Sequence, residues 1–102
     1  MKIYGKEIDF KISRLKDAGN YETALNEMQA NETELSKYSG PMTGLIEMCI
    51  NMFRNFFKRA TGTDVLEGCE DLDEAKKAYL EFLDEIKKQK SDILGITAAD
   101  IK

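Results

Sequence analysis

Histidine is absent from this 102-residue chain, and cysteine occurs only twice. Histidine is the commonest general base at neutral pH and the commonest zinc ligand, so its absence removes the usual centre of both chemistries. Cys49 and Cys69 are too few for a disulfide framework, and without histidine they do not form a zinc site. Cys69 lies among acidic residues, which disfavour the thiolate form that a nucleophile needs. We therefore expect no metal ion and no cofactor.

The sequence also lacks glycine-rich phosphate loops, dinucleotide-binding loops and nucleophile elbows, because its seven glycines are scattered. The densest group of acids, within residues 64–74, does not have the spacing of a calcium loop. It suits a helix start, where the positive end of the helix dipole stabilises carboxylates. No pattern signals a pocket that raises the pKa of one carboxyl group for acid and base catalysis. We predict that the protein is not an enzyme.

Long apolar runs are missing as well. The richest apolar stretch is interrupted by Glu47, Asn51 and Arg54, which excludes a membrane span, and the first residues lack the apolar core of a signal peptide. Hydrophobic residues at 42% and charged residues at 33% are typical of one small globular domain, which we expect in the cytoplasm. A net charge of −4 repels nucleic acid, and the lysines alternate with carboxylates at helical spacing. We therefore expect neither a nucleic-acid nor a membrane partner.

Local patterns predict a mainly α fold, a three-helix domain with a short N-terminal β-hairpin. Ile8, Phe10 and Ile12 alternate with polar residues, which indicates a strand and predicts a hairpin over residues 1–12 with its turn at Gly5 and Lys6. Two strands alone are marginally stable in water. The hairpin therefore needs a helix beneath it or a strand of another chain beside it.

Helix start and stop signals divide the rest of the chain. Asp17 or Asn20 is a suitable cap for the first helix, and Pro41 separates it from the second, because proline cannot continue a helix but fits its first turn. Asp71 with Glu74 has the spacing of a capping box at the start of the third. We predict helices over residues 17–38, 41–60 and 72–90, followed by a tail over residues 91–102.

The central helix is apolar over an unusually wide arc. At about 100° per residue, its apolar side chains cover roughly 200° of the circumference, about twice the stripe of a one-sided amphipathic helix. These side chains are Met42, Leu45, Ile46, Met48, Cys49, Ile50, Met52, Phe53, Phe56 and Phe57. We assign the side centred on Cys49, Phe53 and Phe56 to the core. Such a helix needs two neighbours, either two helices of its own chain or one helix and a partner protein.

The two flanks of this arc are the candidate partner-binding residues. Met48 and Met52 form one flank, and Ile46, Ile50 and Phe57 form the other. Methionine and phenylalanine occur both in cores and in adaptable binding grooves. For these five residues, burial by the chain itself and burial against another protein both remain open.

The order of features along residues 1–90 adds a resemblance. A predicted hairpin and a first helix precede a Met- and Phe-rich helix with the sequence MCINMFRNFFKRATG, and a capped helix follows with the sequence DLDEAKKAYLEFLDEIKKQ. This order resembles a family of small proteins encoded by tailed bacteriophages and prophages of Gram-positive bacteria. The resemblance implies a place among tail-assembly genes, where similar small helical proteins are tail assembly chaperones that bind the helical tape-measure protein.

The functional hypothesis is therefore a phage or prophage tail assembly chaperone, located in the cytoplasm of a bacterial host. Its partner would be a helical protein component of the phage tail, held against the flanks of the central helix. We also expect a homo-oligomer. One alternative is a structural or connector protein of the phage tail that forms a permanent homo-oligomer, and a second is a small regulator that binds nucleic acid.

Overall fold

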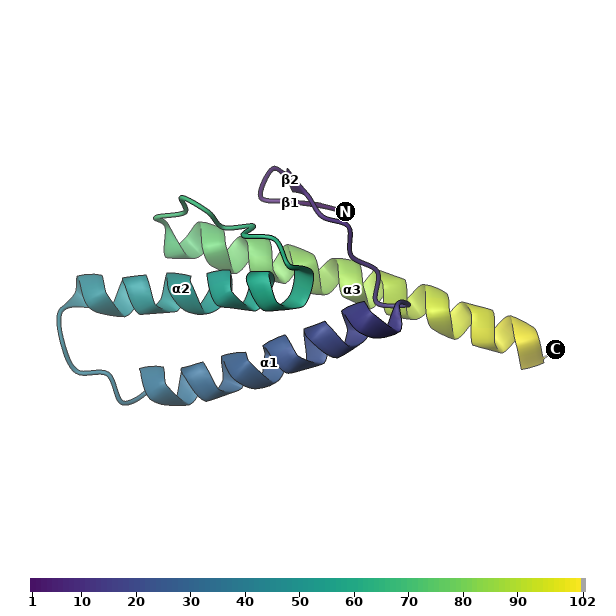
Figure 1. Ribbon diagram of the computed structural model, residues 1–102, viewed down its shortest axis with the longest axis horizontal. Coiled ribbons are helices and arrows are strands. Elements are labelled where there is room, and N and C mark those ends of the chain that lie inside the picture. Colours follow the sequence, from purple (N-terminus) through teal and green to yellow (C-terminus); the bar gives the residue numbers. More distant parts are fainter. Residues whose placement is uncertain (102) are drawn as a thin grey trace.

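The computed structural model describes the backbone of residues 1–101 and the side chains of residues 1–95. It confirms a mainly α fold of three helices with a short N-terminal hairpin (Figure 1). The elements are β1 (Lys2–Ile3), β2 (Lys6–Glu7), α1 (Leu15–Leu35), α2 (Met42–Thr61) and α3 (Leu72–Ile101). Within the described residues, no helix is long and apolar enough to cross a bilayer.

The hairpin is shorter than predicted, and its turn lies one residue earlier. β1 and β2 pair antiparallel with Ile3 opposite Lys6, so the turn residues are Tyr4 and Gly5. Both have positive φ angles, 52° and 74°, which is the conformation of a type I′ turn. Residues 8–12 form no strand, although Ile8 and Phe10 are buried as the alternation predicted. The hairpin lies against α3 of its own chain, so a helix supports it as one of the two predicted arrangements requires.

The first helix begins and ends earlier than predicted. Arg14 is the N-cap residue of α1 and makes no side-chain cap hydrogen bond. Asp17, which we had assigned as a cap, lies in the first turn and accepts a hydrogen bond from the Lys11 backbone N–H at 3.0 Å. Asn20 lies inside the helix. The helix ends at Leu35, three residues before the predicted end at residue 38 and well before Pro41.

Both ends of α2 lie within one residue of the predicted range, 41–60. Pro41 is its N-cap residue, and Gly62 ends it in the left-handed conformation with φ 76°. Lys58 and Arg59 lie in its last turn, where the helix dipole stabilises positive charge. The central helix was predictable because proline and glycine act through their backbone geometry, which tertiary contacts do not alter.

The third helix starts at the predicted residue, Leu72, but it extends beyond its predicted end at residue 90. The Asp71 carboxylate accepts hydrogen bonds from the backbone N–H groups of Asp73 and Glu74, at 2.8 and 3.3 Å. The Glu74 carboxylate does not complete a capping box, because it accepts a hydrogen bond from the Tyr4 hydroxyl. The helix then continues to Ile101, so the prediction of a separate tail after residue 90 is wrong for residues 91–101.

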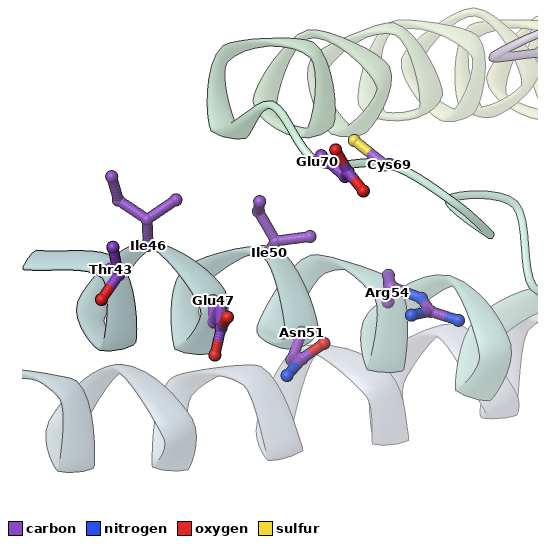
Figure 2. Close-up of a pocket in the computed structure, with 8 residues that line it drawn as sticks. All are labelled: Thr43, Ile46, Glu47, Ile50, Asn51, Arg54, Cys69 and Glu70. Atoms are coloured by element: carbon purple, nitrogen blue, oxygen red, sulfur yellow. The ribbon is translucent and has the colours of Figure 1, made fainter.

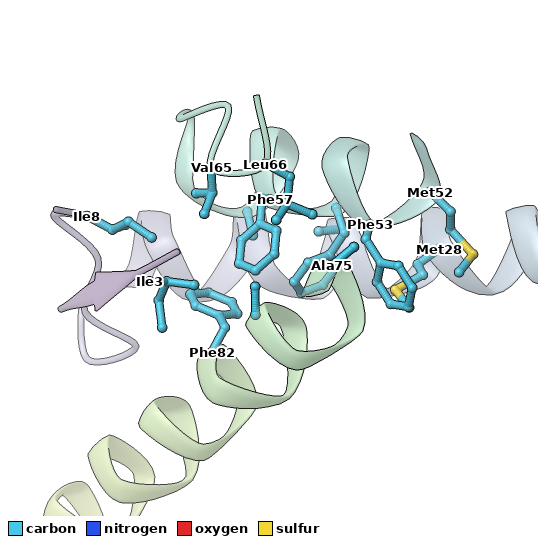
Figure 3. Packing of buried hydrophobic residues seen from close by; sticks show 14 of the residues in the cluster. Ile3, Ile8, Met28, Met52, Phe53, Phe57, Val65, Leu66, Ala75 and Phe82 are labelled. Carbon is cyan, nitrogen blue, oxygen red and sulfur yellow. The ribbon is translucent and has the colours of Figure 1, made fainter. Parts of the chain in front are cut away.

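The core is an aromatic cluster centred on Phe82, which is completely buried in α3 (Figure 3). Its ring contacts those of Phe10, Phe56 and Phe57, with centroids 5.2, 5.8 and 5.4 Å away. Tyr21 of α1 adds a fourth ring at 6.3 Å. Edge-to-face pairs of this kind stabilise beyond the burial of their area alone. The cluster therefore joins the N-terminal segment and all three helices.

Candidate functional site

The helices are staggered. α3 covers the C-terminal part of α2, and the first turns of α2 extend beyond the start of α3. Figure 1 shows α1 and α2 antiparallel and side by side, while α3 begins partway along α2 and continues past its far end. The molecule is accordingly elongated, with extents of 58 × 28 × 19 Å. Because α3 does not cover the first turns of α2, apolar side chains there are exposed to solvent, although they lie on the same face of α2 as the core residues.

The exposed part of this surface consists of Met42, Leu45 and Ile46, which we call the apolar overhang. At 100° per residue these side chains share a face with Phe53 and Phe56. The two phenylalanines are buried, with Tyr79 of α3 packed against each at centroid distances of 5.2 and 5.0 Å. By contrast, Met42 is 67% exposed and Ile46 is 37% exposed, and Leu45 is half-buried. One face of α2 is thus core in one half and surface in the other.

Beside the overhang lies a cavity of about 430 Å³ between α2 and the loop that precedes α3, which we call the α2 groove. Its apolar wall consists of Ile46, Ile50 and Cys69. Its polar side chains are Thr43, Glu47, Asn51, Arg54 and Glu70 (Figure 2). The groove therefore joins an apolar strip on α2 to a rim that carries hydrogen-bonding and charged groups.

Among the described residues that line the α2 groove, Arg54 is the one basic residue, and it is paired with Asp64. Its guanidinium donates two hydrogen bonds to the Asp64 carboxylate, at 3.2 and 2.6 Å. This pairing lowers the pKa of Asp64 and raises that of Arg54, because the hydrogen bond and the opposite charge favour both charged forms. Lys58 lies 3.9 Å from the same carboxylate. The pair fixes the loop against α2 and shapes one end of the groove.

The structure separates the five predicted partner-binding residues into three groups. Ile46 and Ile50 both line the α2 groove, although Ile50 is buried. Met48 and Met52 line a smaller hollow of about 180 Å³ between α1 and α2, where Met48 is 38% exposed and Met52 is buried. Phe57 is completely buried in the aromatic cluster.

The assignment of Phe57 to a partner-binding surface is therefore corrected, and the same correction applies to Ile50 and Met52, which are only 6% and 8% exposed. Val65 and Leu66 are also completely buried, and Figure 3 shows them beside Phe57. The helical pattern could not separate Phe57 from Ile46, because it reports the direction of a side chain and not the position of the covering element along the helix.

Sequence reasoning also missed residues of the site. Met42 and Leu45 belonged to the wide apolar arc but not to the predicted binding set, and their place before the start of α3 is visible only in three dimensions. Cys69 and Glu70 come from the loop, where nothing in the sequence indicated that they face α2. Their placement depends on a tertiary fold-back, which leaves no periodic signal.

Comparisons place the chain within a family but among no proteins of known function. Neither the curated proteins nor the solved structures include a match to it. The matching family spans residues 4–98, from the turn of the hairpin into the last turns of α3, and so includes every residue of the α2 groove. The chain belongs to the family described as "Family of unknown function (DUF6673)".

Proposed function

We propose that this protein is a helix-binding adaptor, and specifically a phage or prophage tail assembly chaperone that holds a helix of the tape-measure protein. The observation that carries the helix-binding part is the division of α2, whose apolar face is buried by α3 near Phe53 and uncovered at Ile46. The tail-assembly part is supported by the sequence resemblance alone.

An incoming helix would continue the cover that α3 provides. Apolar side chains three and four residues apart on that helix would meet Met42, Leu45 and Ile46 in the way that Tyr79 meets Phe53 and Phe56. Full burial of one such side chain contributes about 1.5–3 kcal/mol. The overhang is already partly buried, so a bound helix would gain less than this from each side chain, and the complex would dissociate readily. A chaperone must release its client, and a modest apolar contact permits this.

The test compares two aspartate substitutions at exposed apolar positions. Ile46→Asp places a carboxylate in the proposed contact, while Leu80→Asp places one on α3, where the side chain is 50% exposed and outside the groove. Where a gene for a tape-measure protein lies beside the gene for this chain, binding is measured against that protein. We expect Ile46→Asp to weaken binding by about 100-fold or more, because the carboxylate must be desolvated, and Leu80→Asp to leave it unchanged.

Circular dichroism and urea unfolding of both variants separate folding from binding. If Ile46→Asp binds like the wild type while both variants fold, the overhang is not the binding surface. Gene neighbours test the biological setting independently, since an adjacent tape-measure gene supports the chaperone role and a metabolic operon refutes it.

A second candidate function is a structural component of the phage tail that assembles with copies of itself. Exposed apolar side chains occur toward both ends of the elongated molecule: Met42 and Ile46 at the start of α2, and Leu94, which is 60% exposed, near the protruding end of α3. A head-to-tail contact needs two such different surfaces. Light scattering distinguishes the candidates, because a fixed higher oligomer favours the structural role and a monomer or small exchanging species favours the chaperone.

A further inference from the structure

Negative charge is in excess around the α2 groove. Glu47 on α2 and Glu70 on the loop are both exposed at the groove, and across the described residues neither makes an ion pair or side-chain hydrogen bond. The positive charge of Arg54 is already paired with Asp64. The rim therefore presents two unneutralised carboxylates to whatever occupies the groove.

These two carboxylates come from the two elements that line the groove, α2 and the loop. Figure 2 shows Ile50 pointing from α2 toward the loop that carries Glu70, while Glu47 projects from another side of α2. An occupant that contacts the exposed part of Ile46 therefore lies in a groove whose lining includes both carboxylates. Like charges at such a rim disfavour binding, and opposite charges favour it and accelerate association.

We propose that the helix held in the α2 groove is a basic amphipathic helix, which carries lysine or arginine beside its apolar face where it meets Glu47 and Glu70. This inference rests on the proposed helix-binding function and adds the charge of the partner to it. The carboxylates exclude acidic helices of equal hydrophobicity, so that the apolar contact supplies attraction and the rim supplies selectivity.

Two synthetic helical peptides of about 18 residues, a length at which isolated helices begin to be stable, test the proposal. They share one apolar face of leucine and phenylalanine, and the polar face carries lysine in one peptide and glutamate in its twin. Fluorescence anisotropy gives the dissociation constants. We expect the lysine peptide to bind roughly tenfold more tightly at low salt, since each exposed ion pair is worth about two- to fivefold. The difference should nearly vanish at about 1 M salt, where the screening length is about 3 Å.

The decisive variant is Glu47→Lys combined with Glu70→Lys, which should reverse the preference between the two peptides. Its matched control is Glu22→Lys combined with Glu81→Lys, which makes the same change in net charge at exposed positions outside the groove. The control should keep the preference for the lysine peptide. Loss of the preference in both double variants would show that net charge alone selects the peptide, and would overturn the proposal.

The remaining outcomes separate this inference from the function on which it rests. If the wild type binds both peptides equally and Ile46→Asp abolishes both, the groove binds helices but the charge inference is refuted. If neither peptide binds, helix binding itself is refuted. If light scattering shows a dimer that Ile46→Asp dissociates and that neither peptide displaces, the occupant is a second copy of this chain, which also refutes the proposal.

Discussion

Replacing Phe57 by alanine tests where the core of this protein ends and the candidate binding surface begins. The Phe57 side chain has no exposed area, and its ring lies 5.7 Å from that of Phe56 and 5.4 Å from that of Phe82. Burial of a phenylalanine contributes about 1.5–3 kcal/mol, and each ring pair adds about 0.5–1.5 kcal/mol. We therefore expect the free energy of unfolding to fall by about 3–5 kcal/mol, as is usual for such truncations.

A loss of that size is a large part of the stability of a small domain, which is about 5–15 kcal/mol in total. At about 4–8 °C per kcal/mol, the melting temperature should fall by roughly 12–40 °C. Urea and thermal unfolding followed by circular dichroism measure both quantities. The matched variant is Met48→Ala, whose side chain is 38% exposed and which should lose less than about 1.5 kcal/mol. If Phe57→Ala unfolds like Met48→Ala, then Phe57 is not a core residue, and its original assignment to a partner surface returns.

Three further substitutions test local features of the chain. Gly62→Ala should lower the free energy of unfolding by roughly 1–2 kcal/mol, because Gly62 has φ 76°, which costs a residue with a Cβ about that much. Gly19→Ala, in the interior of α1 where an added Cβ meets no atom within 4 Å, should raise it by about 0.5–1 kcal/mol, and equal urea midpoints for the two variants would contradict this reasoning. Asp64→Asn removes a carboxylate whose pKa in the folded protein is lowered by Arg54, so its contribution to stability is present above the unfolded pKa of about 3.9 and is lost as the pH falls through the lower folded pKa. We expect this variant to be less stable at neutral pH and to show a flatter decline in urea midpoint between about pH 5 and pH 2.

Backbone-encoded features of the fold were predictable from the sequence. Pro41, Gly62 and Asp71 mark element ends through dihedral preference and local hydrogen bonding, and the structure has α2 and α3 beginning or ending at these residues. The start of α1 was mispredicted because the Asp17 carboxylate does not cap the helix but binds two groups in the segment before it. It binds the Lys11 backbone and the Arg14 guanidinium, 3.3 Å away, and therefore stabilises the turn before the helix from a position inside it.

The end of α3 was mispredicted for a different reason. Hydrophobic periodicity weakens after residue 90, since a helix that leaves the core no longer needs an apolar stripe. Periodicity reports burial, and helical hydrogen bonds continue without it. The same limitation explains the candidate site. The arc on α2 identified Ile46 and Met48, which are exposed, together with Ile50, Met52 and Phe57, which are buried.

The path of a single loop accounts for both the closed core and the open groove. α2 has 20 residues, so it is about 30 Å long at about 1.5 Å per residue. The ten residues between Thr61 and Leu72 span about 33 Å when extended, which is enough to return the chain to the start of α2. They do not extend, because the loop turns inward to bury Val65 and Leu66 completely. α3 therefore begins partway along α2, the overhang stays uncovered, and the last loop residues become the second wall of the groove. A loop that stayed extended would cover Ile46 with α3 but leave Val65 and Leu66 in water, so the inward turn that completes the core is also what leaves open the groove that we propose as a helix-binding site.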